Sequence, residues 1–96
     1  MTLPEDIIAK VRQDFTDDDM IPILQLLSEL QKEDSKIFGD RILRCIVFLA
    51  GGSFEEFADA VAMARLDWRD LIVEAEYDGW YGEHNRRRNL NLPFGS

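Results

Sequence analysis

Apolar residues are concentrated in one segment near the middle of the chain. Between Ile42 and Ala50, eight of nine positions are apolar, and only Arg44 interrupts them. A helix that is apolar on nearly every side needs neighbours on nearly every side, whereas the other periodic segments have one apolar and one charged face. The pattern therefore predicts amphipathic helices packed around a central helix at residues 41–50. Arg41 and Arg44 share one face of that helix, and we expect acids on neighbouring helices to pair with them.

The central segment also has some β character at residues 45–48, and periodicity alone does not separate a buried strand from a buried helix. Two flanking features favour the helix. Asp40 is a good N-cap, and Gly51-Gly52 supplies a left-handed residue that ends a helix. The chain has no second β-rich run, and a lone strand would leave its backbone groups without hydrogen bonds. We therefore expect a helix here.

Two amphipathic helices are predicted before the central one. Thr2 and Glu5 have capping-box spacing, and apolar residues then recur on one face to about residue 15. The second helix starts near Asp18 or Asp19, because Pro22 then falls within its first turn. It ends in the polar residues 31–34, and a linker follows at residues 35–39.

Two further helices are predicted after the central one, which makes five in all. Ser53 and Glu56 form a capping box for a helix that ends near residue 65. Asp67 caps the last helix, which ends at Gly79. Trp68 falls on the inner face of this helix, so we expect it in the core. The predicted fold class is all-α: a compact bundle of about five helices in one domain, residues 1–79.

The composition changes after residue 79. Residues 80–96 contain two aromatic residues, three consecutive arginines and the ending NLNLPFGS. Apolar residues alternate with polar ones near the end, and Pro93 disfavours a helical conformation at the residue before it. We therefore expect residues 80–96 to form an extended C-terminal arm.

Composition favours a small globular protein of a reducing compartment. The chain of 96 residues is 46% hydrophobic and 31% charged, which is ordinary for one folded domain. Its single cysteine, Cys45, forms no internal disulfide. The N-terminus lacks the basic region and apolar stretch of a secretion signal, and the nine-residue apolar run is far shorter than the roughly 20 residues that span a bilayer. We expect a cytoplasmic protein with no membrane partner.

Negative charge is spread unevenly along the chain. The net charge is −8: residues 1–34 and 51–79 each carry −6, whereas residues 35–50 and 80–96 each carry +2. Phosphate binding needs clustered Lys and Arg, which the acidic blocks lack, so we expect no nucleic-acid partner. An acidic surface attracts basic partners. The alternative is that the charge only keeps the protein soluble.

The sequence contains few candidates for catalysis or ligand binding. One His and one Cys, almost forty residues apart, make no zinc or iron–sulfur site. The acidic run at residues 17–19 lacks the glycine and closing glutamate of a calcium loop. Cys45 lies in the most apolar segment, which indicates a core thiol rather than a nucleophile. We expect no metal, no cofactor and no enzymatic activity.

Two alternatives remain open at this point. Carboxylates four residues apart, such as Glu74 and Asp78, would allow an enzyme that uses surface acids and bases. The two helices predicted between residues 54 and 78 would allow a DNA-binding regulator of the helix-turn-helix type. Its recognition helix would be strongly acidic, however, and phosphate would repel it.

Residues 40–78 contain three short motifs: Asp-Arg-x-x-Arg-Cys in the central helix, Gly-Ser before the next helix, and Asp-Trp-Arg-Asp at residues 67–70. They resemble the motifs of a group of short, uncharacterised bacterial helical proteins. The resemblance implies a small bacterial cytoplasmic helical protein, and it carries over no catalytic or ligand residues. In size, charge and helical class the chain is also similar to small acidic immunity proteins, which neutralise basic nuclease toxins.

Two stretches are predicted to bind another protein. The acidic end of the last helix is followed by two aromatic residues of a type that is enriched at binding hot spots but is also common in cores. The arginines beyond them would bind an acidic patch, including one on a second copy, which would give an arm-exchanged homodimer. The predicted binding residues are Glu74, Glu76, Asp78, Trp80, Tyr81, Arg86, Arg87 and Arg88. The leading hypothesis is a non-enzymatic interaction module, in its sharpest form an immunity- or antitoxin-like inhibitor of a basic partner.

Overall fold

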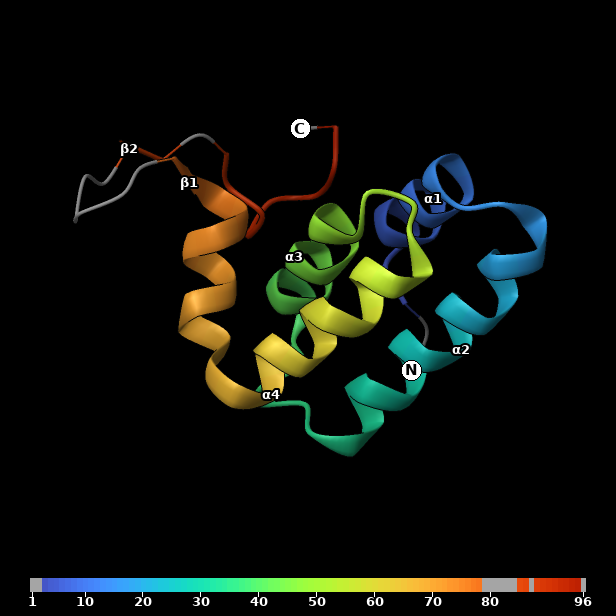
Figure 1. Ribbon diagram of the computed structural model, residues 1–96, viewed down its shortest axis with the longest axis horizontal. Helices are drawn as coiled ribbons and strands as arrows, with labels where there is room; N and C mark the ends of the chain where they lie inside the picture. The colour runs from blue at the N-terminus through green and yellow to red at the C-terminus, as the bar shows by residue number, and fades with distance from the viewer. Residues whose placement is uncertain (1–2, 79–84, 87, 96) are drawn as a thin grey trace.

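Four helices make up most of the computed structural model, which describes residues 3–78, 85–86 and 88–95 (Figure 1). They are α1 (Glu5–Asp14), α2 (Asp17–Glu33), α3 (Asp40–Ala50) and α4 (Phe54–Glu76). Two strands of two residues each, β1 (Tyr77–Asp78) and β2 (Asn85–Arg86), pair in antiparallel fashion. The Cα radius of gyration, 12.7 Å, is close to the value of about 12.5 Å expected for a compact domain of this length. The predicted all-α bundle is confirmed.

The first two helices begin without side-chain caps. Pro4 and Thr16 occupy the N-cap positions of α1 and α2, and neither side chain accepts a cap hydrogen bond. Three acids at residues 17–19 lie in the first turn of α2, where they interact favourably with the positive end of the helix dipole. The helix begins at Asp17, one or two residues earlier than predicted, so Pro22 lies in the second turn. Thr2, the predicted cap of α1, lies outside the described residues.

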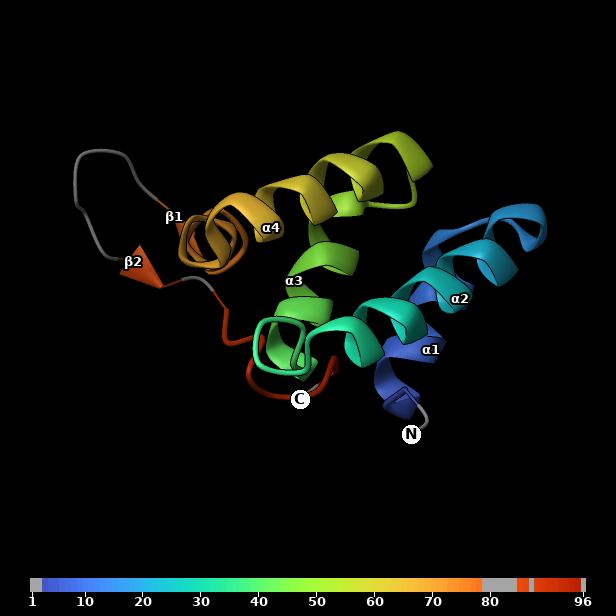
Figure 2. The same ribbon diagram turned by 90° about the horizontal axis from the view of Figure 1, so that it is seen from below.

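Helix α3 buries seven of its eleven residues and packs against α4 and α1 (Figure 2). Gly39 occupies the N-cap position, and Asp40, predicted as the cap, is the first helical residue. Gly51 ends the helix in the left-handed conformation, with φ 55°, as its position in the sequence predicted. The residues that α3 buries are Ile42, Leu43, Arg44, Cys45, Ile46, Val47 and Ala50.

Helix α4 contains one interruption, at Asp67. The helix starts as predicted, because Ser53 Oγ accepts a hydrogen bond from the N–H of Glu56 at 3.3 Å. Asp67 has non-helical backbone angles (φ −156°, ψ 99°), and its Oδ1 accepts a hydrogen bond from the N–H of Arg69 at 3.0 Å. This is N-cap geometry inside a longer helix, and the helix bends there (Figure 1). The structure therefore describes four helices rather than the expected five, with the last two joined as α4.

One apolar cluster connects all four helices with the loops and the C-terminal segment. Phe15, just after α1, makes an edge-to-face contact with Phe57 of α4, with 6.5 Å between ring centroids. Phe38, before α3, and Leu90, near the C-terminus, are buried in the same cluster. No helix in the described ranges is both long enough and apolar enough to cross a membrane.

Residues 88–95 fold back onto the helices instead of extending away from them. The N–H of Phe94 donates to Asp6 Oδ2 at 3.0 Å, and the carbonyl of Leu90 accepts a hydrogen bond from Arg44. The N–H of Leu92 donates to the carbonyl of Asn89 at 3.2 Å, which forms a turn. The extended arm is therefore wrong for this part of the chain, because its backbone groups find partners on α1, on α3 and in a local turn.

The two glycines between α3 and α4 provide a test of this packing. Both have positive φ, but a Cβ on Gly51 would meet nothing within 4 Å, whereas one on Gly52 would lie 2.3 Å from the carbonyl oxygen of Asp14. We expect Gly51→Ala to lower the free energy of unfolding by about 1 kcal/mol through backbone strain alone. Gly52→Ala adds a clash with rigid backbone and should cost about 3 kcal/mol.

Urea unfolding followed by circular dichroism measures both variants. Equal losses for the two alanines would contradict the close approach of Gly52 to the end of α1.

Candidate functional site

Six exposed carboxylates lie along α4, and we call this set the acidic α4 surface. None of the six forms an ion pair with a cation in the described part of the chain. Unpaired surface carboxylates keep their full attraction for an incoming positive charge. The members are Glu55, Glu56, Asp59, Asp67, Asp70 and Glu74.

Exposed apolar side chains gather on the same helix. Four of the seven large apolar residues that are exposed among the described residues belong to α4: Phe54, Leu66, Trp68 and Val73. Leu66 is the extreme case, with 89% of its surface exposed. All residues from 65 to 70 are exposed where the helix bends at Asp67. Leu66 lies between Arg65 and Asp67 and, at this exposure, adds little to the core.

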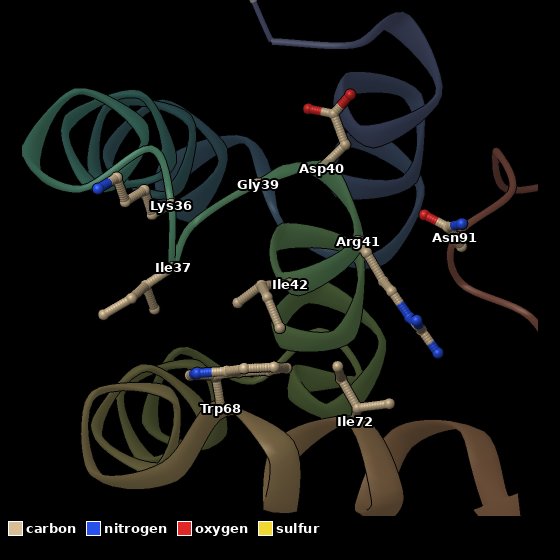
Figure 3. Close-up of a pocket in the computed structure, with 9 residues that line it drawn as sticks. All are labelled: Lys36, Ile37, Gly39, Asp40, Arg41, Ile42, Trp68, Ile72 and Asn91. Carbon is tan, nitrogen blue, oxygen red and sulfur yellow. The ribbon is translucent and has the colours of Figure 1, made fainter.

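A groove lies between the N-terminal end of α3 and the second half of α4, and we call it the Trp68 groove (Figure 3). It has a volume of 330 Å³, and Ile37, Ile42, Trp68 and Ile72 form its apolar lining. A second hollow of 320 Å³ shares Trp68 and Ile72 and continues along α4 to Val73. Trp68 was expected in the core, but 41% of its surface is exposed, because the bend at Asp67 places it at the edge of this groove.

Unpaired positive charge is found at the Trp68 groove. The guanidinium carbon of Arg69 lies 5.3 Å from the centre of the Trp68 ring, a cation–π contact. Lys36 lines the groove on the α2–α3 connection, and neither Lys36 nor Arg69 forms an ion pair with a described acid. Figure 3 shows that the ammonium group of Lys36 and the carboxylate of Asp40 both point away from Trp68 and Ile72. Arg69 therefore places an unpaired positive charge beside Trp68 in a strongly negative protein.

One wall of the groove is held by a buried ion pair. Arg41 donates to both carboxylate oxygens of Glu76, at 2.8 and 2.9 Å, and Glu76 is fully buried. The hydrogen bonds to Glu76 raise the pKa of Arg41 above its ordinary value, against the opposite effect of burial. Glu76 was predicted to bind a partner. This prediction is wrong, because the carboxylate is enclosed and already paired within the chain.

The other predicted binding residues have mixed outcomes. Glu74 is exposed on α4. Arg88 packs against its own chain: its guanidinium carbon lies 4.3 Å from the centre of the Phe48 ring, and it donates a hydrogen bond to the carbonyl of Ala75. Part of the predicted set lies outside what the structure describes: Trp80, Tyr81, Arg87 and the side chains of Asp78 and Arg86.

A second ion pair joins α1 to α3. Arg44 Nε donates to Asp6 Oδ2 at 2.8 Å, and Arg44 is only 6% exposed. Partial burial raises the pKa of Asp6, but hydrogen bonds from Arg44 and from the N–H of Phe94 outweigh it, so the pKa lies below its ordinary value. Arg41 and Arg44 thus both find acidic partners, as their shared face predicted. Sequence reasoning did not name the partners, since each lies more than 30 residues away along the chain.

The described residues offer no arrangement for metal binding or nucleophilic chemistry. No group of three His, Cys, Asp or Glu in these ranges lies close enough to hold a metal ion. Burial raises the pKa of the Cys45 thiol to about 12, so it stays protonated at neutral pH.

No family model matches the chain, and neither the curated proteins nor the solved structures contain a match. The resemblance of residues 40–78 to short bacterial helical proteins stays a prediction.

Glu74 and Glu76 provide a matched test of which carboxylates are structural. We expect Glu76→Gln to lower the free energy of unfolding by about 2 kcal/mol, because it leaves Arg41 without its charged partner. Glu74→Gln changes an exposed side chain and should cost less than about 0.5 kcal/mol. Chemical unfolding measures both. Equal effects would mean that the buried pair with Arg41 contributes nothing to the fold.

Cys45 provides a test of the enclosure of α3. A disulfide reagent such as Ellman's reacts with an accessible thiolate. Burial keeps the reagent from Cys45, and the raised pKa keeps the thiol protonated. At about pH 8, where an ordinary thiol is partly ionised, we expect the native protein to react at least about 100-fold more slowly than the protein unfolded in guanidinium chloride. Rapid labelling of the native protein would show that the thiol is accessible.

Proposed function

We propose that this protein is a cytoplasmic, non-enzymatic interaction module whose acidic α4 surface binds a basic surface of another protein. Its sharpest form is an immunity- or antitoxin-like inhibitor of a basic partner. The observation that carries the proposal is Leu66, which is 89% exposed on a helix whose six exposed carboxylates form no ion pair within the described residues.

The mixture of charge and apolar surface supports a protein partner. Complete burial of an exposed leucine side chain contributes about 1.5–3 kcal/mol. The surrounding carboxylates would steer a basic partner toward α4 and set its orientation, while contributing less to affinity than the buried leucine. Phe54 and Val73, also exposed on α4, would extend the contact along the helix.

A fixed framework under the surface supports the same proposal. In this proposal α3 is the central apolar helix, and the halves of α4 on either side of Asp67 act as the fourth and fifth helices of the bundle. The buried residues of α4, such as Phe57 and Leu71, hold its inner side against the core. A surface that is already ordered costs less conformational entropy on binding. Asp78, Trp80 and Tyr81, which follow α4 in the sequence, are proposed to continue the binding surface.

Capture of the partner and measurement with the purified pair test the proposal. The immobilised protein is used to capture binding proteins from the host, and the candidate is then titrated by calorimetry. We expect a basic partner whose Kd rises about tenfold with Leu66→Gln, a loss of about 1.4 kcal/mol. Glu74→Lys should weaken binding and reduce its dependence on salt, because it places a like charge against the basic partner.

Helix α2 provides matched controls. Ile21 and Glu29 are also exposed, so Ile21→Gln and Glu29→Lys repeat the same chemical changes away from α4. Equal weakening by the α2 variants would contradict the proposed surface. Salt-sensitive retention on duplex DNA would favour the regulator instead, and turnover lost in a Glu→Gln variant that still folds would favour the enzyme.

A further inference from the structure

We propose that the Trp68 groove binds a short segment of another protein that carries an apolar side chain next to carboxylates. This goes beyond the function proposed above, because it concerns a different surface with the opposite charge preference. The acidic α4 surface would attract cations, whereas the groove offers cations of its own.

The shape of the groove suits a peptide segment. The hollow at Ile42 and the one that continues to Val73 both include Trp68 and Ile72, so the apolar lining extends along α4. The hollows are open to solvent on one side, whereas small-molecule sites enclose most of their ligand. An open apolar channel beside a helix is typical of sites that receive one or two anchor side chains of a peptide.

The charges at the groove select the chemistry of the segment. Several cations elsewhere in the described residues are already neutralised by acids of the same chain, whereas Lys36 and Arg69 are not. The neutralised cations are Lys10, Arg41, Arg44 and Arg65. An acidic segment would therefore gain a charge contact with Arg69 without breaking an existing ion pair, and Lys36 adds positive charge at the edge of the groove.

The acids of α4 do not cancel this positive charge. Asp70 and Glu74 lie two residues before and after Ile72, which places them about 160° around the helix from it. Arg69 lies about 60° from Ile72 and reaches the groove side, where it lines the second hollow. The second half of α4 thus separates its charges, with carboxylates on the outer side and a guanidinium beside Trp68.

Arg69 is well placed to recognise a carboxylate. Its guanidinium lies near the Trp68 ring, so the aromatic surface holds the cation close to the apolar lining. Guanidinium groups bind carboxylates through two parallel hydrogen bonds. An apolar anchor on the Trp68 ring would place a neighbouring Asp or Glu within reach of Arg69. Asn91, at another edge of the groove (Figure 3), offers an amide donor and acceptor to the peptide backbone.

A displayed library of random 12-residue peptides tests the proposal. The library is selected on the wild-type protein and counter-selected on Trp68→Ala, which removes the aromatic edge but no buried core residue. We expect the enriched peptides to be rich in Asp and Glu around a Leu, Ile, Phe or Trp. Synthetic copies should bind wild type with a Kd that rises at least about fivefold in Arg69→Glu and in Lys36→Glu.

Arg12→Glu is the matched control, because Arg12 is exposed on α1, outside the groove lining, and the change of charge is the same. This variant and Leu66→Gln should keep the wild-type Kd for the peptides, which separates the groove from the acidic α4 surface. Basic or uncharged enriched peptides would overturn the proposal, as would equal weakening by Arg12→Glu. A library that yields no enriched peptides would also overturn the proposal. Sedimentation would then show whether the protein forms a dimer that Trp68→Ala dissociates, in which case a second copy, and not a peptide, occupies the groove.

Discussion

Burial of Arg44 is the constraint on which much of the fold depends. A guanidinium that is almost fully enclosed is costly unless its charge is paired and its donors are used. Asp6 of α1 supplies the charge, and the carbonyl of Leu90 accepts a further hydrogen bond. Because the N–H of Phe94 also donates to Asp6, a single cluster holds α1, α3 and the C-terminal segment together. Any rearrangement of the three elements would leave a buried charge without a partner.

The bend at Asp67 has the second large effect on the molecule. It lets α4 keep Phe57 and Leu71 in the core on either side, while the residues between 65 and 70 are exposed. Leu66 and Trp68 are thereby withdrawn from the core, although both belong to a helix that packs on α3. In the second half of α4, Asp70 and Glu74 lie on the side of the helix away from Ile72 and the Trp68 groove. One element therefore carries two surfaces of opposite charge preference.

The fold was largely predictable because its signals are local. A capping serine, a helix-ending glycine and a period of apolar residues act within a few positions of each other, so the positions of α3 and α4 follow from their own residues. Cys45 could be assigned to the core for the same reason. The sequence did not predict the number of helices, because Asp67 has N-cap geometry and yet the helix continues through it as α4. Whether such a cap separates two helices depends on the angle at which the second half packs against the core.

The exposed surfaces were less predictable, because exposure depends on neighbours distant in the sequence. In the sequence, Glu76 looks like one more surface acid of the last helix. In the structure it is buried and paired with Arg41, which lies 35 residues earlier in the chain. Trp68 reads as a core residue, yet the bend leaves it at the edge of a groove. The C-terminal segment reads as an extended arm, yet Asp6 and Arg44 hold it in turns on the bundle.

The sequence by itself determined that the chain forms helices, that α3 ends at Gly51 and α4 begins after Ser53, and that its charge is mainly negative. These properties arise from interactions between residues a few positions apart. Only the tertiary structure decided which acids are paired, which aromatic ring is exposed and where positive charge remains unneutralised. Those outcomes depend on long-range contacts between side chains, and periodicity along the chain carries no information about them.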